Sequence, residues 1–337
     1  MNRPNTPRLS RRLVAQSLVA LAALTVAGAG LPVRAQPASD RPMRLIVGVP
    51  PGSATDLIAR IFSDHLARQL GQPVIVENRP GGIGSLATGA FLSAPHDGQT
   101  WLLAVNGFFS EAPHTLKLNF DPLKDVRPLV EIGGGGLVLV GNATLPPKTL
   151  PELVAWVKGN PGKVNYASYS PGSLSHVLGL QLNKAAGLDM LHVGYKGSPP
   201  AQQDLIGGQV QFMFDAPPSA LPFIKSGKLR AFAVTSPQRM ALLPDVPTLA
   251  ELGYKDLTRT SWVALWTTPD TPEPAQRRMR EASLKALEQP ALRTRFGEIG
   301  VEIQAGTPMA PEQMSRQLAA DHAAMGDTLK AINYKPE

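Results

Sequence analysis

The chain has 337 residues, no cysteine, and 33 lysine and arginine residues against 26 aspartate and glutamate residues. The lack of cysteine excludes disulfides, thiolate metal sites, a cysteine nucleophile and a lipoprotein cysteine anchor. Five of the basic residues lie in the first 35 positions, so 28 basic residues face 26 acidic ones in the remainder. That balance gives no reason to expect a nucleic-acid partner.

The first 35 residues have the order typical of a secretory signal peptide. A basic start is followed by an apolar run over 13–31 and by Val33-Arg34-Ala35, which is similar to a cleavage site. An uncleaved membrane anchor is the alternative, but the alanine-rich run that ends in small residues favours cleavage. Ser10-Arg11-Arg12-Leu13 resembles a twin-arginine signal, yet paired arginines also occur in Sec signals, so both export routes stay open. We therefore expect a periplasmic protein.

The remaining 300 or so residues exceed the size at which one core usually stops growing, so two domains are expected. Strand-like apolar runs alternate with amphipathic stretches, which is typical of an α/β fold with largely parallel sheets. In the first part the pattern predicts strands over 44–49, 73–77 and 101–105, and helices over 56–70 and 85–94.

A second alternating set follows. It predicts strands over 137–140, 165–168, 191–193, 210–214 and 229–235, and helices over 149–158, 176–186 and 200–206. A strand over 261–267 then returns to the first part, and helices over 274–288, 290–297 and 311–332 end the chain. We expect a first lobe over 36–138, a second lobe over 139–256, and a return to the first lobe over 257–337. Two lobes joined by two chain crossings indicate a clamshell binding protein.

The most informative segment, Val49 to Asp56, joins a predicted strand to a helix. Ligands of open α/β sheets bind beyond the carboxyl ends of the strands, and a helix N-terminus there favours an anion. Ser53, Ala54, Thr55 and Asp56 are the candidate binding residues. Plain helix capping explains the segment equally well, because Ser53 with Asp56 three residues later is a capping box.

The second segment, 168–176, repeats this arrangement in the other lobe. Its candidate binding residues are Ser168, Ser170, Gly172, Ser173, Ser175 and His176. Capping, with His176 packed beneath the loop, is again the alternative. One hydroxyl-rich helix start per lobe could hold a carboxylate from two sides without a metal.

Other motifs indicate neither an enzyme nor a cofactor. Gly82 to Ala87 fits the outline G-x-G-x-x-A, but Asn106 stands where the confirming acid of a dinucleotide site should be, so we expect a tight turn. There is no G-x-S-x-G, Walker or H-E-x-x-H motif, and none of the six histidines has metal-binding spacing. We therefore predict no catalytic residue, no metal site and no cofactor.

Three further positions lie at strand ends. Asp215 could serve as a functional carboxylate or as a turn residue before Pro217. Phe108 and Phe109 could line a ligand cavity or fill the core, and Trp262 near a crossing has the same two interpretations.

Many ordered segments resemble the substrate-binding receptors of tripartite tricarboxylate transporters, the Bug-type proteins. The resemblance covers the mature chain. It rests on segments 49–52, 55–56, 71–81, 94–98, 160–163, 195–198, 204–210, 214–215, 219–222 and 243–248.

This resemblance implies a type II periplasmic binding fold. It also implies that a carboxylate binds at the first strand–helix loop and at the equivalent loop of the second lobe, often through water, with Asp215 near the ligand. Ser53 replaces a second glycine of the family pattern, Tyr169 replaces a small residue, and Phe108-Phe109 replace small polar residues. These departures favour a bulkier or aromatic acid.

The sequence thus predicts a monomeric periplasmic solute-binding protein. It would take a small carboxylate as ligand and membrane transporter subunits as partners, with no nucleic-acid partner. A ligand sensor that docks onto a membrane kinase is an alternative, because its binding site would look the same. A periplasmic enzyme is a third possibility, against which the absence of a nucleophile–base motif argues.

Overall fold

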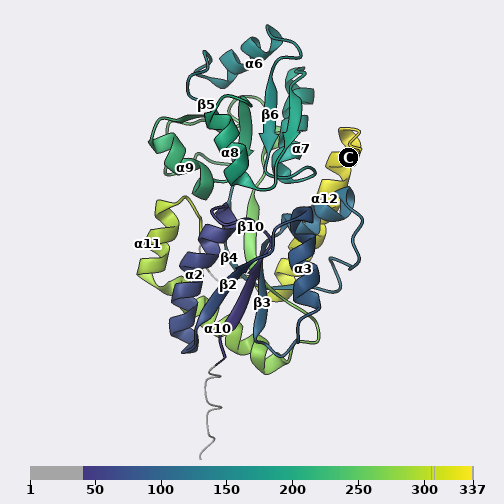
Figure 1. Cartoon of the computed structure of the whole chain (residues 1–337), viewed down its shortest axis with the longest axis vertical. Coiled ribbons are helices and arrows are strands. Elements are labelled where there is room, and N and C mark those ends of the chain that lie inside the picture. Colours follow the sequence, from purple (N-terminus) through teal and green to yellow (C-terminus); the bar gives the residue numbers. More distant parts are fainter. Residues whose placement is uncertain (1–40, 305, 307, 336–337) are drawn as a thin grey trace, which may run out of the picture. The chain divides into compact units, whose positions relative to one another are not determined.

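The computed structural model describes residues 41–304, 306 and 308–335, so the predicted signal peptide over 1–35 lies outside the described residues. The described chain forms two five-stranded sheets, each with helices on both faces (Figure 1). We call the first sheet with its helices lobe 1 and the second lobe 2. No helix in this part of the chain combines the length and apolar character that crossing a membrane requires.

The sheet of lobe 1 has the strand order β2-β1-β3-β10-β4. Its strands are β1 (Met43–Val47), β2 (Val74–Asn78), β3 (Thr100–Val105), β4 (Arg127–Gly135) and β10 (Ser261–Thr267). β1 pairs in parallel with β2 and β3, whereas β10 is antiparallel to β3 and β4. The strand that returns from lobe 2 is therefore inserted between two strands of lobe 1.

The sheet of lobe 2 follows the same plan, with the order β7-β6-β8-β5-β9. Its strands are β5 (Val138–Asn142), β6 (Asn165–Ser168), β7 (Leu191–Gly194), β8 (Phe212–Asp215) and β9 (Leu229–Val234). β6 pairs in parallel with β7 and β8, and β5 is antiparallel to β8 and β9. β6, the second strand in this order, thus corresponds to β1.

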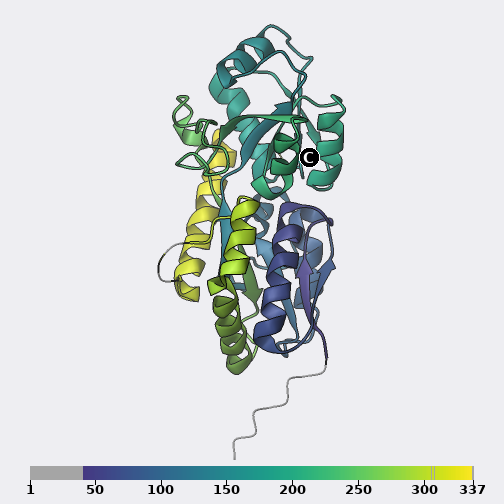
Figure 2. The same cartoon turned by 90° about the vertical axis from the view of Figure 1, so that its left-hand side faces the viewer.

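Side chains that alternate along the strands build a core on each face of lobe 1. Leu45 and Val47 of β1 pack with α2 (Ala54–Leu70), α10 (Glu273–Glu288) and α11 (Pro290–Glu298), which lie together in Figure 2. Ile46 faces the other side, where the core includes residues of α3 (Ser85–Leu92), α4 (Gly107–Ser110) and α12 (Pro311–Ala331). The short helix α5 (Ala112–Thr115) follows α4 directly.

Lobe 2 is built in the same way. Leu139 packs with α6 (Leu150–Lys158) and α7 (Leu174–Ala186), whereas Val138 and Val140 pack with α8 (Ser198–Ile206) and α9 (Pro217–Lys225). Met325 and Leu329 near the end of α12 join the first of these cores. The C-terminal helix therefore packs against both lobes.

The two chain crossings lie next to each other. One joins β4 to β5 through the glycine run 133–136, and the other enters β10. A Cβ atom added to Gly134 would lie 2.2 Å from the carbonyl oxygen of Ser261, and one added to Gly136 would lie 2.5 Å from the backbone nitrogen of Ser236. Only glycine permits this close approach of the first crossing to Ser261 at the start of β10 and to Ser236, which follows β9.

The predicted α/β fold with two lobes and two crossings is confirmed, and most element bounds agree within a few residues. Four strands and α-helices were not predicted, namely β4, α4, α5 and α9, and neither was the short 3-10 helix over Lys255–Leu257. β4 ends in glycines, which weaken a strand pattern, and α9 contains three prolines, one of them inside the helix. The helices α4 and α5 have four residues each, too few to show a helical period.

Candidate functional site

A cavity of about 480 Å³ lies between the two lobes. Strand-to-helix loops of both sheets line it, in agreement with the general position of ligand sites in open α/β sheets. From lobe 1 come residues after β1, β2 and β3, and from lobe 2 come residues after β6, β7 and β8. The lining includes 48–50, 53–55, 80–84, 107–108, 111, 134–137, 169–171, 173–174, 195–198 and 215–218.

The start of α2 offers free hydrogen-bond donors beside this cavity. Ser53 is the N-cap residue, but its side chain makes no capping hydrogen bond. Its hydroxyl oxygen is buried and has no partner among the described residues. The backbone N–H groups of Ala54 and Thr55 likewise find no acceptor in the described part of the chain. Since buried polar groups are normally paired, these three donors mark a place where a ligand acceptor would fit.

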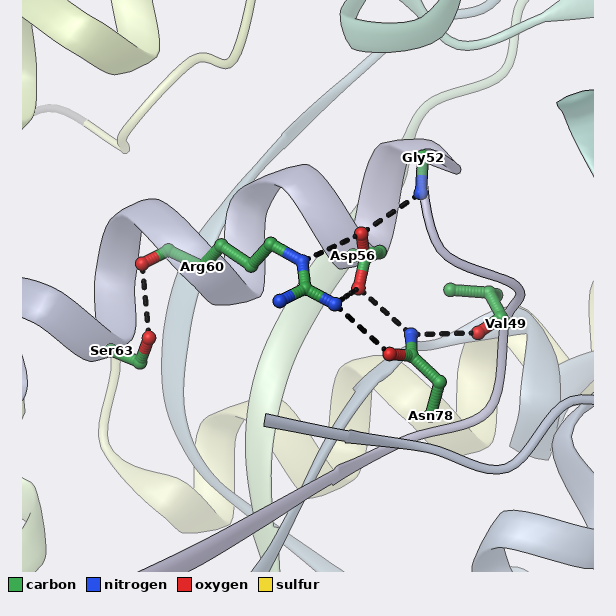
Figure 3. Close-up of polar contacts among 6 residues, drawn as sticks. All are labelled: Val49, Gly52, Asp56, Arg60, Ser63 and Asn78. Atoms are coloured by element: carbon green, nitrogen blue, oxygen red, sulfur yellow. Dashed lines mark hydrogen bonds and ion pairs between the residues drawn. The ribbon is translucent and has the colours of Figure 1, made fainter. Parts of the chain in front are cut away.

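Asp56, in contrast, holds the loop between β1 and α2 in place through hydrogen bonds on the side away from the cavity (Figure 3). Its carboxylate accepts hydrogen bonds from the Gly52 backbone N–H at 2.9 Å, from Asn78 Nδ2 at 2.8 Å and from Arg60 Nε at 3.0 Å. Asn78 Nδ2 also donates to the Val49 carbonyl oxygen at 3.0 Å. Asp56 and Asn78 thus hold the segment from Val49 to Gly52 against the start of α2.

The electrostatics of Asp56 agree with this role. Burial by itself would raise the pKa of Asp56, but the hydrogen bonds from Arg60, Asn78 and Gly52 outweigh it and keep the pKa below its usual value. The carboxylate is almost completely buried, and it does not line the cavity. Asp56 is therefore an ionised structural group beneath the site.

The start of α7, the equivalent helix of lobe 2, is arranged differently. The Ser173 hydroxyl donates to the Ser170 carbonyl oxygen at 2.6 Å, so it does not cap the helix. The Leu174 N–H donates to Glu111 Oε2 at 2.8 Å, and Glu111 comes from the junction of α4 and α5 in lobe 1. The anion position at the α7 start is therefore occupied by a carboxylate of the chain itself. Burial raises the pKa of Glu111 to about 7, and the nearby charge of Asp321 adds to this effect.

The other candidates in the second segment lie behind the cavity lining. The Ser168 hydroxyl pairs with His192 Nε2 at 2.7 Å, and the Ser175 hydroxyl donates to the Phe214 carbonyl oxygen at 2.6 Å. His176 accepts the Gly172 N–H at 3.0 Å and stacks on His192 with ring centroids 3.6 Å apart. Burial, with the neighbouring His192, lowers the pKa of His176 to about 3, so its ring is neutral at physiological pH. Only Ser170 and Ser173 of the six candidates line the cavity.

Asp215 lines the cavity and is fully buried. Its carboxylate accepts hydrogen bonds from Ser198 Oγ at 2.8 Å, Gln202 Nε2 at 2.6 Å, the Ala216 N–H at 2.9 Å and Ser219 Oγ at 3.0 Å. Burial raises the pKa of Asp215 to about 6 although these hydrogen bonds act in the opposite direction. This carboxylate ties the starts of α8 and α9 to the end of β8.

The two phenylalanines after β3 have different environments. Phe108 lines the cavity, and a Cβ added to Gly84 would lie 2.0 Å from its ring. Phe109 is fully buried and packs against Trp266 with ring centroids 4.2 Å apart. Trp262 stacks on Trp266 and donates from Nε1 to Asp321 at 2.9 Å, which ties the second crossing to α12.

Sequence reasoning missed several parts of the lining, among them Glu111, the loop from Tyr195 to Ser198 and the turn over Gly82–Gly84. Glu111 contacts a residue 63 positions away, and no local motif marks that contact. The loop from Tyr195 to Ser198 was noticed only as a family segment, although it follows a strand and opens a helix, which is a usable signal. At Gly82–Gly84 the sequence predicts a tight turn before a helix, and the structure has a short 3-10 helix that leads into α3. These three residues also line the cavity, which the sequence did not indicate.

The chemistry of the cavity is that of binding. Its lining is mainly glycine, proline, aliphatic and aromatic, and its charged members are Glu111, Lys196 and Asp215. Across the described residues there is no group of three His, Asp or Glu side chains that could hold a metal ion. The cavity can therefore enclose an apolar body and hold one polar end at the start of α2.

Comparisons with known proteins agree with this picture. The sequence model of a family described as "Tripartite tricarboxylate transporter family receptor" matches residues 58–333. The BugT protein of Bordetella pertussis (strain Tohama I) is 39% identical over 264 residues, which are 75% of this chain and 79% of BugT.

Two solved structures with bound ligands are similar over most of the chain. MatC from Rhodopseudomonas palustris with bound malate has a TM-score of 0.81 at 30% identity, over 86% of this chain and 99% of MatC. Rpa4515 from R. palustris with adipate has a TM-score of 0.84 at 26% identity, over 89% of this chain and 99% of Rpa4515. The fold of this chain is thus the two-lobed periplasmic binding protein fold of type II.

Proposed function

Because this chain belongs to the receptor family of the tripartite tricarboxylate transporters, whose members are binding proteins and not enzymes, we propose that it is the periplasmic receptor of such a transporter. In this role it captures a small carboxylated molecule in the cavity between its lobes and delivers it to membrane transporter subunits. The predicted signal peptide would export the chain by the Sec or twin-arginine route and then be removed.

The observation that carries the proposal is the set of unpaired donors at the start of α2. A ligand carboxylate placed there accepts hydrogen bonds from the Ser53 hydroxyl and from the N–H groups of Ala54 and Thr55. Hydrogen bonds to a charged group contribute about 1.5–3 kcal/mol each, and a helix N-terminus adds about 0.3–1 kcal/mol. After the cost of association, such a set supports binding in the micromolar range, which corresponds to about 8 kcal/mol.

The other end of the ligand would lie among apolar side chains. Phe108, Leu116 and Tyr169 line the cavity, and they favour a chain or ring over a small polar acid. Ser170, Ser173 and Asp215 add polar groups to the lining on the side of lobe 2. Both ligand-bound relatives hold a dicarboxylic acid, malate in MatC and adipate in Rpa4515, so the family fold accepts carboxylates.

The proposal is tested by measuring the thermal stability of the purified protein with acids and with their matched amides. A ligand at 100 times its dissociation constant stabilises the folded state by about 2.7 kcal/mol, which raises the melting temperature by a few degrees. We expect this shift with an acid and not with its amide, and we expect Ser53→Ala to weaken it. Equal shifts with acid and amide, or no shift with any acid, would contradict the proposal.

Delivery is tested separately. Membrane fractions that contain the transporter subunits should retain the ligand-loaded receptor, and uptake of the acid should stop when the receptor gene is deleted. If a membrane kinase retained the loaded receptor and deletion of the receptor gene left uptake of the acid unchanged, delivery to a transporter would be contradicted. The proposal that the protein captures a carboxylate would still stand.

A further inference from the structure

We propose that Glu111 is a specificity-determining residue that limits the ligand to one carboxylate, so that this receptor selects monocarboxylates over dicarboxylates of the same length. The inference rests on the proposed function and adds to it the class of acid. The starts of α2 and α7 both face the cavity, but among the described residues the first N–H group of α2 has no acceptor, whereas that of α7 already binds Glu111.

At the start of α2 the donors are free, but at the start of α7 the donor is used. The Leu174 N–H binds Glu111 Oε2 at 2.8 Å, and Glu111 is only 6% exposed. This contact crosses from lobe 1 to lobe 2, because Glu111 ends α4 whereas Leu174 begins α7. A second ligand carboxylate thus finds its helix start already neutralised by a protein carboxylate.

The charges around the cavity oppose a second anion as well. Glu111 and Asp215 line the cavity and are buried, so the charge of each ionised form is poorly screened. All four groups that donate hydrogen bonds to the Asp215 carboxylate belong to lobe 2. The hydrogen-bonding capacity of this carboxylate is therefore satisfied without a ligand. Two carboxylates that share a buried site repel each other strongly.

Lys196 is the one cationic residue in the cavity lining that the structure describes. Its side chain is exposed, so water screens its charge and reduces its ability to offset Glu111. The enclosed part of the cavity therefore suits an uncharged or hydrogen-donating end of the ligand, opposite the carboxylate at α2.

The position of Glu111 is rigidly supported. The neighbouring Phe109 packs in the core of lobe 1, and Thr115 in the last turn of α5 lies so close to the loop of lobe 2 that a Cβ added to Gly172 would be 2.6 Å from its hydroxyl oxygen. The carboxylate cannot easily withdraw to make room for a second ligand anion.

The test is calorimetric titration of the wild-type protein at about pH 8, where Glu111 with its pKa of about 7 is mostly ionised. The titrants are acid pairs that differ only in the far carboxylate, hexanoate against adipate and benzoate against terephthalate. We expect the monoacid of at least one pair to bind about tenfold tighter or more, since like charges at a buried site cost several-fold to many-fold in affinity. Glu111→Gln keeps an oxygen acceptor for Leu174 but removes the charge, so the preference should fall to about twofold or less. Glu111→Asp should retain the preference for the monoacid.

Glu288→Gln, which removes an exposed carboxylate at the end of α10, serves as the control and should leave the preference unchanged. Diacids that bind the wild-type protein as tightly as their monoacids overturn the inference while the proposed function stands. Binding of no acid overturns both. The wild-type comparison decides the matter even when Glu111→Gln fails to fold.

Discussion

Glu111 Oε2 lies 2.8 Å from the backbone nitrogen of Leu174, and this hydrogen bond joins the two lobes directly beside the cavity. A carboxylate at the first N–H of a helix is a favourable arrangement, which in this protein is made between elements 63 residues apart. Burial raises the pKa of Glu111 to about 7. The free energy of unfolding therefore depends on whether the Glu111 carboxyl group is protonated.

The first prediction concerns the pH dependence of stability. Because the pKa of Glu111 is raised from 4.5 to about 7 on folding, its contribution is fully present below about pH 4.5 and is lost as pH rises toward 7. Glu111→Gln lacks this loss. We expect the free energy of unfolding of the variant, relative to wild type, to increase between about pH 5 and 8 by up to about 3 kcal/mol.

Urea denaturation of both proteins over this pH range measures the difference. The contributions of Asp215 and of the histidines are common to both proteins and cancel. Two parallel curves would show that Glu111 is not the buried titrating group.

Ser53→Ala should separate binding from stability. The hydroxyl oxygen of Ser53 has no partner among the described residues, so its removal should change the free energy of unfolding by less than about 0.5 kcal/mol. Affinity for the acid should fall about tenfold, because one hydrogen bond to a carboxylate is lost. Ser93→Ala, at an exposed helix end, is the matched control for both measurements. A stability loss of several kcal/mol, or unchanged affinity, would show that Ser53 is only a cap.

Asp56→Ala, in contrast to Ser53→Ala, should lower the stability of the folded protein. It removes the acceptor of Gly52, Asn78 and Arg60, and we expect it to cost about 2–3 kcal/mol of stability. Asp64→Ala replaces an exposed aspartate of the same helix and should stay within about 0.5 kcal/mol of wild type. Chemical denaturation checks both values. If Asp56→Ala were as stable as Asp64→Ala but unable to bind, Asp56 would be a ligand contact and not a support.

Much of the fold could be predicted from the sequence because its signals are local. The helical spacing of Ile58, Phe62 and Leu66 predicted α2, and these residues are fully or almost fully buried in the core of lobe 1. The strand over 261–267 has the predicted bounds. The β4 strand was missed because its pairing with β10 is long-range and its last three residues are glycines.

The candidate site could be predicted only to the level of its loops. A hydroxyl-rich helix start predicts donors, but the sequence does not show which donors find partners inside the protein. Ser53 remains unpaired, whereas Ser175 binds the Phe214 carbonyl oxygen on a neighbouring strand. The occupation of the α7 start by Glu111 depends on how the two lobes pack, which no sequence period encodes.

Phe108 and Phe109 form a natural matched pair for ligand size. Phe108→Leu should enlarge the cavity and improve the affinity for bulkier acids relative to smaller ones by a few-fold, since Phe108 lines the cavity. Phe109→Leu should cost about 1–2 kcal/mol of stability without changing that ratio, since Phe109 packs against Trp266. Titration with acids of increasing length measures the ratio. If both variants changed the affinity ratio equally, the change would come from altered core packing and not from the size of the cavity.

The most direct test of the central claim is the response of individual backbone amides to the ligand. In a nitrogen–proton correlation spectrum, titration with an acid identified by the stability screen should shift the amide signals of Ala54 and Thr55, with saturation at the affinity found by calorimetry. The matched amide should leave both signals in place. Shifts confined to Leu174 and its neighbours, with Ala54 and Thr55 unchanged, would contradict the account, because the acid would then bind at the helix start that Glu111 occupies.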